Sequence, residues 1–218
     1  MHRVLEPELM DDEAQSVAYA KADFSASNQM FVDGLVRDFP DRLGAIVDLG
    51  CGPGDIDVRL ARAAPGASIN AVDGSGPMIA LAGQAVRAAG LERRITLLHG
   101  RLPGLALAGH SADAVISKDL LHHLPDPSVL WSEVVRVVRR GGAVYVMDLV
   151  RPSTPDDARR IVEAVAGQED AILRQDFFNS LCAAFTVDEL REQLRAADLP
   201  LGVAQISDRH MLIKGVLP

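Results

Sequence analysis

A short glycine-rich stretch, Val47 to Asp55, constrains the fold of this 218-residue chain more than any other feature. The apolar run Ala45-Ile46-Val47 leads into it and is typical of a strand that is buried on both faces. Glycines then fall at alternate positions, Gly50, Gly52 and Gly54. Asp55 is the expected N-cap of a helix over residues 56–64, whose apolar side chains share one face. The pattern predicts a strand, a tight turn and a helix at the carboxyl edge of a parallel sheet, where glycines let a ligand approach the backbone.

Two acids beside this turn indicate the kind of ligand that it suits. A dinucleotide fingerprint has the form G-x-G-x-x-G and holds a pyrophosphate at the helix N-terminus. Here the form is G-x-G-x-G, and Asp48 precedes it by two residues, which disfavours a pyrophosphate and suits an ammonium group. A second strand over residues 68–72 ends at Asp73, whose carboxylate can accept both hydroxyls of a ribose. The turn therefore predicts a pocket for a ribose and a cationic amine, without phosphate.

With these residues the chain resembles the class I S-adenosylmethionine-dependent methyltransferases, whose first motif is D/E-x-G-x-G-x-G. The later run Leu121-His122-His123-Leu124-Pro125-Asp126 lies in register with that family, and the resemblance covers residues 40–150. It implies S-adenosylmethionine as cofactor, S-adenosylhomocysteine as product, and methyl transfer to a small-molecule acceptor by in-line displacement. The cofactor-binding positions that it implies are Asp48, Gly50, Cys51, Gly52, Gly54, Asp73, Gly74, Met78, Gly100, Arg101, Leu102, Ser117 and Lys118.

One position departs from the family. An acid usually follows the glycine after the third strand and binds the adenine amino group, but Arg101 follows Gly100 here. The adenine contact is therefore left open, with backbone groups or stacking of the Arg101 guanidinium as substitutes.

Strands alternate with helices along the chain, which predicts an α/β fold with a parallel sheet covered on both faces. The family implies a seven-stranded, mostly parallel, doubly wound (Rossmann-like) sheet with its last strand antiparallel. We expect a single domain over residues 1–218, with N-terminal lid helices (1–44), a cofactor-binding core (45–150), a helical substrate-side insertion (151–185) and a C-terminal helix with a β-hairpin (186–218).

Local signals place the individual elements. The expected helices cover residues 11–24, 25–39, 75–89, 126–140, 155–167, 170–183 and 186–197, and the further strands cover residues 95–98, 114–117, 144–147, 201–206 and 211–216. Gly141-Gly142 is expected to end the fourth of these helices.

Charge and composition exclude several classes of partner. A net charge of −8 argues against nucleic acid, whose recognition uses lysine and arginine opposite phosphates. No apolar run reaches the length of a bilayer span, so we expect a cytoplasmic protein with no membrane partner. Cys51 and Cys182 stand far apart and are expected to be reduced thiols, and the six histidines show no metal-ligand spacing, so no metal is expected. The oligomeric state stays open, with a homodimer as one option.

Methyl transfer from a sulfonium chiefly requires that the acceptor be positioned, and it requires a general base only where the acceptor holds its proton tightly. The candidate catalytic residues are His122, Asp119, Tyr19 and Arg151. Three of these candidates have a specific structural alternative: His122 can brace a helix start, Asp119 can cap a helix, and Arg151 can form a surface ion pair. Further candidates for the acceptor side are Phe24 and Asn28 in the lid, and Arg174, Asp176, Phe177, Phe178, Asn179 and Ser180 in the insertion.

Two rival functions share these features. A nicotinamide-dependent oxidoreductase would use the same strand, turn and second-strand acid, although the glycine spacing and Asp48 disfavour it. A non-catalytic cofactor-binding protein, or the silent partner of a heterodimer, would keep the fold without turnover.

Overall fold

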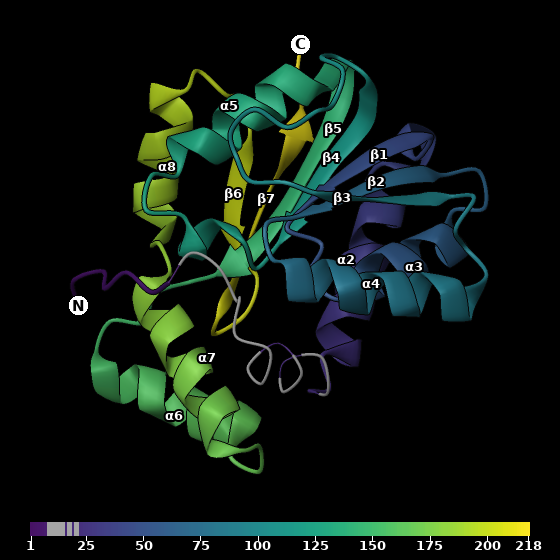
Figure 1. Ribbon diagram of the computed structural model, residues 1–218. Coiled ribbons are helices and arrows are strands. Elements are labelled where there is room, and N and C mark those ends of the chain that lie inside the picture. Colours follow the sequence, from purple (N-terminus) through teal and green to yellow (C-terminus); the bar gives the residue numbers. More distant parts are fainter. Residues whose placement is uncertain (8–15, 17–18, 20–21) are drawn as a thin grey trace.

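A seven-stranded sheet runs through the centre of the molecule in the order β3-β2-β1-β4-β5-β7-β6 (Figure 1). The computed structural model describes residues 1–7, 16, 19 and 22–218. The strands are β1 (Ala45–Leu49), β2 (Ser68–Asp73), β3 (Ile95–His99), β4 (Ala112–Lys118), β5 (Val138–Leu149), β6 (Gly202–Gln205) and β7 (His210–Val216). The first five strands are parallel, while β7 pairs antiparallel with both β5 and β6. The predicted doubly wound sheet with an antiparallel last strand is therefore confirmed.

Helices cover both faces of this sheet (Figure 1). On one face lie α2 (Ser25–Asp38), α3 (Asp55–Ala63) and α4 (Gly76–Ala89), and on the other lie α5 (Ser128–Val137) and α8 (Val187–Ala196). Successive side chains of a strand point to opposite faces. Val144 and Val146 of β5 accordingly pack in the core beside α5, and Tyr145 and Met147 pack in the core beside α2. Burial on both sides explains why the central strands read as continuous apolar runs.

The strand order reverses between β1 and β4, because the chain goes from β1 outward to β2 and β3 and then returns to β4 on the other side of β1. In open α/β sheets a crevice forms beyond the carboxyl ends of the strands at such a reversal. The topology therefore places a ligand site beside the glycine turn that follows β1 and the residues that follow β4.

Helix ends follow the local signals in the sequence. Ser75 caps α4 by accepting a hydrogen bond from the Met78 amide, and Gly90 ends that helix in a left-handed conformation. Thr186 and Glu189 form the predicted capping box of α8. The insertion contains two helices, α6 (Pro155–Ala166) and α7 (Ala171–Ala183), which lie side by side at the carboxyl edge of the sheet (Figure 1).

Two local predictions are wrong. The N-cap of α3 is Gly54, not Asp55, because Gly54 has φ 81° and the left-handed conformation at that point suits glycine. Helix α5 ends at Val137 rather than at Gly141-Gly142, and β5 begins at once with Val138. Gly141 has φ 71° and lies inside β5, where the register against β4 shifts between Ala112 and Ala114. The glycine pair therefore belongs to a bulge in a long strand.

The N-terminal segment, residues 1–7, lies against the end of α7 and against a short 3-10 turn, η2 (Leu121–His123). The Arg3 guanidinium donates hydrogen bonds to the carbonyl oxygens of Ala183, His122 and Leu124, at 2.6, 2.9 and 2.9 Å. It also lies 3.9 Å from the centroid of the Phe185 ring. This segment thus connects the insertion to the turn that follows β4.

The helix expected over residues 11–24 falls mostly outside the described residues. Within the part of the chain that the structure describes, no helix is both long and apolar enough to cross a membrane. Cys51 and Cys182 are both buried, free thiols.

Candidate functional site

The glycine turn after β1 uses its three glycines in two ways. A Cβ at Gly50 would lie 2.9 Å from the Leu120 Cβ, and one at Gly54 would lie 3.1 Å from the Ala82 Cβ, so packing requires glycine at both positions. Gly52 has φ 53°, and a Cβ there would meet nothing within 4 Å. The backbone at Gly52 therefore faces open space, which is the close approach to a ligand that a glycine permits.

Asp73, at the tip of β2, is fixed against this turn. Its Oδ2 accepts a hydrogen bond from the Gly52 amide at 2.8 Å, and its Oδ1 accepts one from the Ser75 amide at 2.8 Å. Each carboxylate oxygen has lone-pair capacity for a further donor. Asp73 lines a narrow cavity of about 30 Å³ together with five other predicted cofactor residues, namely Gly50, Gly74, Gly100, Arg101 and Leu102. Asp73 is the one carboxylate among the described residues that line this cavity.

Asp48 lies beneath the turn rather than on a cavity wall. Its side chain is only 2% exposed and faces that of Asp57, which is fully buried. Burial is the main cause that raises the pKa of Asp48 to about 7, and burial raises the pKa of Asp57 as well, so the pair retains a proton in the folded state. Contact of Asp48 with a ligand ammonium stays a prediction.

Three more of the predicted cofactor positions support the turn from behind. Gly54 packs against Ala82, the Met78 amide binds the Ser75 hydroxyl, and the Ser117 hydroxyl donates to the Leu49 carbonyl oxygen at 2.7 Å. These residues shape the crevice without lining the cavities described here.

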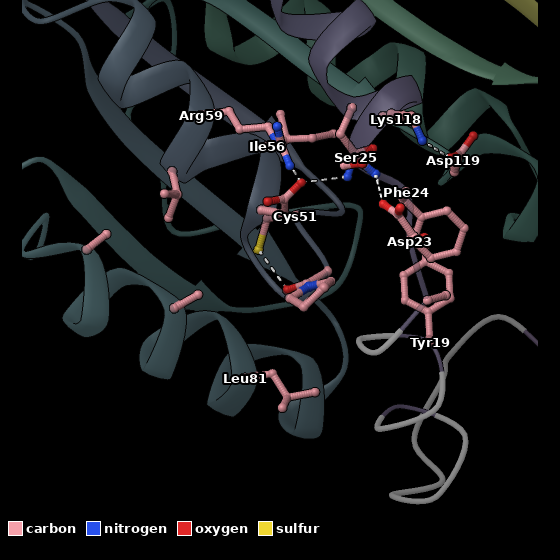
Figure 2. Close-up of a pocket in the computed structure, with 18 of the residues that line it drawn as sticks. Tyr19, Asp23, Phe24, Ser25, Cys51, Ile56, Arg59, Leu81, Lys118 and Asp119 are labelled. Atoms are coloured by element: carbon pink, nitrogen blue, oxygen red, sulfur yellow. Dashed lines mark hydrogen bonds and ion pairs between the residues drawn. The ribbon is translucent and has the colours of Figure 1, made fainter.

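A larger cavity of about 630 Å³ opens on the other side of the turn (Figure 2). Gly50, Cys51 and Gly52 of the turn line it, together with Lys118, the last residue of β4, and Asp119, which follows it. The aromatic rings of Tyr19 and Phe24, whose centroids are 4.7 Å apart, border it from the N-terminal region.

Sequence reasoning missed a polar network on the wall of this cavity. The Asp55 carboxylate accepts hydrogen bonds from Asn28 Nδ2 at 2.9 Å and from Arg59 Nε at 2.7 Å. The spacing of Asp55 and Arg59 on one helix is a readable signal. The approach of Asn28, from a helix that precedes β1, depends on tertiary packing.

A second cavity of about 220 Å³ shares Tyr19, Phe24, Lys118 and Asp119 with the larger one. Its remaining lining includes His122, His123 and His210, together with Asp176, Phe177 and Ser180 of α7. Lys118 and Asp119 therefore stand where the two cavities meet. Of the predicted insertion residues, Asp176, Phe177 and Ser180 line this second cavity. Arg174 and Phe178 line a different cavity beside α6, and the Asn179 side chain forms a hydrogen bond with Gln175.

Asp119 is held in an unusual conformation at this junction. Its backbone has φ 56°, its carboxylate pairs with the Lys118 ammonium, and its Oδ1 is buried without a hydrogen-bond partner. Burial works against ionisation, but the charges of Lys118 and His210 outweigh it and lower the pKa of Asp119. Burial raises the pKa of the neighbouring Tyr19 phenol, which therefore stays protonated. The junction offers an ionised acceptor and a phenol donor.

The two histidines differ in their surroundings. The His122 Nδ1 donates to the Asp148 Oδ1 at 2.7 Å, while the Asp148 Oδ2 accepts from the Leu121 amide at 2.8 Å. Burial alone would lower the pKa of His122, but the Asp148 and Glu6 carboxylates raise it to about 8. Burial and the adjacent His122 lower the pKa of His123 to about 3. The structural alternative for His122, a brace at the turn after β4, thus has an explicit partner in Asp148.

The structure does not bring Arg151 to either cavity. Its guanidinium donates to the Glu189 carboxylate at 2.6 Å and to the Ala184 carbonyl oxygen at 2.8 Å, and its side chain is only 6% exposed. Arg151 therefore joins the end of β5 to α8, as in the ion-pair alternative, although the pair is more buried than a surface pair.

Comparison with known proteins identifies relatives of the central region. Residues 47–146 match the protein family described as "Methyltransferase domain". Methyltransferase GfsG of Streptomyces halstedii is 33% identical over 119 residues, which are 54% of this chain and 42% of that protein. Trans-aconitate 2-methyltransferase of Mycobacterium tuberculosis is 34% identical over 142 residues, which are 65% of this chain and 50% of that protein. The chain spans about half the length of the curated relatives that it matches.

Solved structures share the fold over nearly the whole chain. An S-adenosylmethionine-dependent methyltransferase from Aquifex aeolicus superposes with a TM-score of 0.71 at 15% identity, over 94% of this chain and 98% of that one. The plantazolicin methyltransferase BpumL, solved with a triazolic desmethylPZN analogue and S-adenosylhomocysteine, gives a TM-score of 0.71 at 12% identity, over 94% of this chain and 89% of that one. At these identities the comparison establishes the Rossmann-like methyltransferase fold.

Proposed function

We propose that this chain, which belongs to the class I S-adenosylmethionine-dependent methyltransferase family through its domain at residues 47–146, transfers a methyl group to a small organic acceptor. The observation that carries the proposal is the pairing of Gly52 with Asp73. The Gly52 amide donates a hydrogen bond at 2.8 Å to a carboxylate at the tip of the next strand, and the space where a Gly52 side chain would lie is open. This arrangement suits a ligand that presents ribose hydroxyls to the carboxylate and passes close to the turn.

The residues that line the narrow cavity and the 630 Å³ cavity suit S-adenosylmethionine. Asp73 would accept the ribose hydroxyls, and Gly100, Arg101 and Leu102 would border the adenine after the narrow cavity, now about the volume of one water molecule, has widened. Gly50, Cys51 and Gly52 of the turn would border the methionine portion in the larger cavity, near Lys118. The N-terminus of α3 lies beside this turn, but its first turn carries the acids Asp55 and Asp57, which disfavours the pyrophosphate of a nicotinamide dinucleotide.

When bound, the cofactor supplies a methyl group on a sulfonium, which is already a strong leaving group. The remaining work of the protein is to align an acceptor for in-line attack, an effect that can contribute up to roughly 7–11 kcal/mol in favourable cases. Asp119 stands where the two cavities meet, and its unpartnered Oδ1 would accept a hydrogen bond from an acceptor hydroxyl or amine. Tyr19 and His122 border the same space, and we keep them as positioning candidates beside Asp119.

The acceptor cavity favours a small molecule that is partly polar. Its volume is about 220 Å³, and its lining combines the rings of Phe24 and Phe177 with the charges of Lys118, Asp119 and Asp176. Curated relatives are named for action on demethylmenaquinone and trans-aconitate, which are small organic acceptors of different polarity. A cytoplasmic location and the lack of a nucleic-acid partner stay predictions.

The test is titration calorimetry with S-adenosylhomocysteine and, separately, with a nicotinamide dinucleotide. We expect binding of the first and none of the second. Asp73→Ala should weaken binding by roughly 2–4 kcal/mol, because two charge-assisted hydrogen bonds are lost. Asp41→Ala, which removes an exposed acid far from the turn, is the matched control and should leave affinity unchanged. Tight binding of the dinucleotide, or full affinity in Asp73→Ala, would show that the assignment is wrong.

Turnover is then tested with a panel of phenols, amines, thiols and carboxylates, followed by mass spectrometry of the products. Methylated product from any of them separates an enzyme from a silent cofactor-binding protein. Asp119→Asn should reduce that turnover while leaving the affinity for S-adenosylhomocysteine within a few fold.

A further inference from the structure

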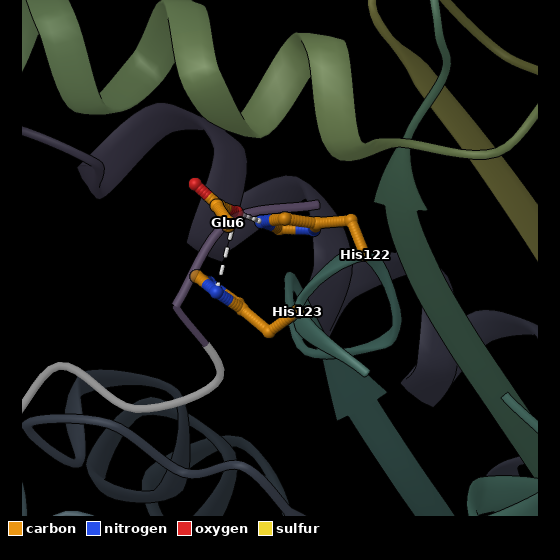
Figure 3. A group of neighbouring side chains, drawn as sticks. All are labelled: Glu6, His122 and His123. Carbon is orange, nitrogen blue, oxygen red and sulfur yellow. Dashed lines mark ion pairs between the residues drawn. The ribbon is translucent and has the colours of Figure 1, made fainter. Parts of the chain in front are cut away.

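Three metal-ligating side chains from distant parts of the chain converge beside the acceptor cavity (Figure 3). Glu6 comes from the N-terminal segment, and His122 and His123 come from the turn η2. One ligand atom from each lies within 4.8 Å of the other two, and no second group of this kind occurs among the residues that the structure describes. Spacing along the sequence could not reveal this group, because Glu6 is so far from the histidines in the chain.

The Glu6 carboxylate lies beside both imidazole rings and forms an ion pair with each, as Figure 3 shows. Its Oε1 is 3.4 Å from His122 Nε2 and 3.2 Å from His123 Nδ1. That oxygen is buried and has no hydrogen-bond partner, while the Oε2 accepts from the Ser180 hydroxyl at 3.2 Å. A buried carboxylate oxygen without a donor is costly, and a cation at this point would satisfy it.

The distances suit a bound transition metal. Zinc binds imidazole nitrogen and carboxylate oxygen at about 2.0–2.2 Å, and tetrahedral geometry then separates neighbouring ligand atoms by about 3.3–3.6 Å. The separation of the Glu6 Oε1 from His122 Nε2, 3.4 Å, lies within that range, and its separation from His123 Nδ1, 3.2 Å, lies just below it. All three ligand atoms lie within 4.8 Å of one another, so an ion could enter with side-chain shifts of no more than about 1 Å.

Asp148 supplies the outer partner that such sites use. A metal-ligating histidine commonly donates its other ring N–H to a carboxylate, which fixes the tautomer and directs the free nitrogen to the metal. The His122 Nδ1 lies 2.7 Å from the Asp148 Oδ1, so the other ring nitrogen, Nε2, is directed toward Glu6 and would exchange its proton for a bound ion. Asp148 is in turn held by the amides of Leu121 and Leu149.

We propose that Glu6, His122 and His123 bind one divalent transition-metal ion of the zinc type, with Asp148 as the positioning residue. Two imidazoles and one carboxylate favour zinc, cobalt or iron over magnesium and calcium, which prefer all-oxygen sites. Three protein ligands leave a further coordination position, as in catalytic zinc sites. Both histidines line the 220 Å³ cavity, so the ion would border the space for the acceptor. An acceptor oxygen on that position would depend on the proposed function, whereas metal binding itself would not.

The experiment uses the full chain after treatment with a chelator, and it adds Zn²⁺ or Co²⁺ alone. We expect about one equivalent of zinc by elemental analysis after dialysis, a rise in Tm with zinc, and visible absorption typical of a low-coordinate site with cobalt. Glu6→Gln and His123→Asn each remove one ligand and should weaken binding by at least about 100-fold, and Asp148→Asn should weaken it about 10–100-fold.

His2→Asn is the matched control, because it removes an exposed histidine from the same N-terminal segment. It should leave the zinc affinity unchanged. Failure to bind a stoichiometric ion, or equal affinity in the wild type, Glu6→Gln and His123→Asn, would overturn the proposal. Since the measurement requires no S-adenosylhomocysteine, its failure is distinct from a failure of the proposed function, and calorimetry on the same variants tests the latter separately.

Discussion

Replacing Asp57 with Asn should make the protein more stable above neutral pH and remove part of the pH dependence of its stability. Asp57 and Asp48 form a buried carboxyl pair beneath the glycine turn. Burial, followed by the charge of Asp48, raises the pKa of Asp57 well above its usual value, and burial raises that of Asp48 to about 7. The pair thus retains a proton in the folded state at a pH where both carboxyls are ionised in the unfolded chain. An asparagine amide at position 57 can donate to Asp48 without needing that proton.

The sign of the effect follows from proton linkage. A group whose pKa is raised by folding stabilises the folded state fully below its unfolded pKa, near 4, and that contribution is lost as the pH rises through the folded value. While the folded state holds one proton more than the unfolded state, the free energy of unfolding falls by about 1.4 kcal/mol per pH unit. Between pH 7 and 9 the wild type should therefore lose up to about 3 kcal/mol through Asp57, and Asp57→Asn should not.

The assay is urea denaturation of the wild type and the variant at pH 5, 7 and 9. The quantity of interest is the difference in the free energy of unfolding between the two proteins, because other titrating groups cancel in it. Asp55→Asn is the control, because Asp55 lies on the same helix but its side chain is 44% exposed. Its free energy of unfolding should vary with pH in parallel with that of the wild type. If the wild type and Asp57→Asn have parallel pH profiles, the pair shares no proton and the reasoning fails.

Two further predictions concern the turn and the N-terminal segment. Gly52→Val should abolish the binding of S-adenosylhomocysteine, measured by calorimetry, and should lower the free energy of unfolding by about 1–2 kcal/mol because it places a side chain at positive φ. Gly104→Val is the control, because Gly104 has φ 89° and equally open space; it should lower the stability similarly and leave the affinity for S-adenosylhomocysteine unchanged. Arg3→Ala should lower the free energy of unfolding by roughly 2–4 kcal/mol, since hydrogen bonds to three carbonyl oxygens are lost. Arg3→Lys should recover only part of that loss in urea denaturation, because an ammonium cannot match the planar fork, and an unchanged stability in Arg3→Ala would contradict the role assigned to it.

The fold could be predicted because its signals are local. An apolar run bounded by glycine or a polar cap marks each central strand, and Ser75, Gly90 and Thr186 mark helix ends by their own chemistry. The prediction failed where two local signals compete. Gly141-Gly142 is a good helix stop, but the β-branched Val138 had already begun a strand, and the glycines serve a bulge instead.

The cofactor side of the site was predictable for a similar reason. The turn and Asp73 lie at the ends of consecutive strands, and parallel neighbours bring such ends together whatever the rest of the chain does. Whether each side chain lines a cavity or is buried against another part of the protein was not predictable. Asp48 faces Asp57 under the turn, and Arg151 pairs with Glu189, because each side chain meets a partner that sequence distance does not suggest.

The acceptor side depends on contacts between segments that are distant in the chain, and these contacts are linked to one another. Arg3 holds residues 1–7 to the carbonyl oxygens of Ala183 and His122, and the same segment carries Glu6 to the imidazoles of His122 and His123. The Glu6 carboxylate also binds the hydroxyl of Ser180, which lines the acceptor cavity. Release of the segment would therefore remove the link that Arg3 makes between α7 and η2 and one ligand of the proposed metal site in the same event. Because Arg3→Ala weakens this docking without altering a metal ligand, it should reduce zinc affinity through position alone, and a full zinc affinity in a destabilised Arg3→Ala protein would show that Glu6 is held by other contacts.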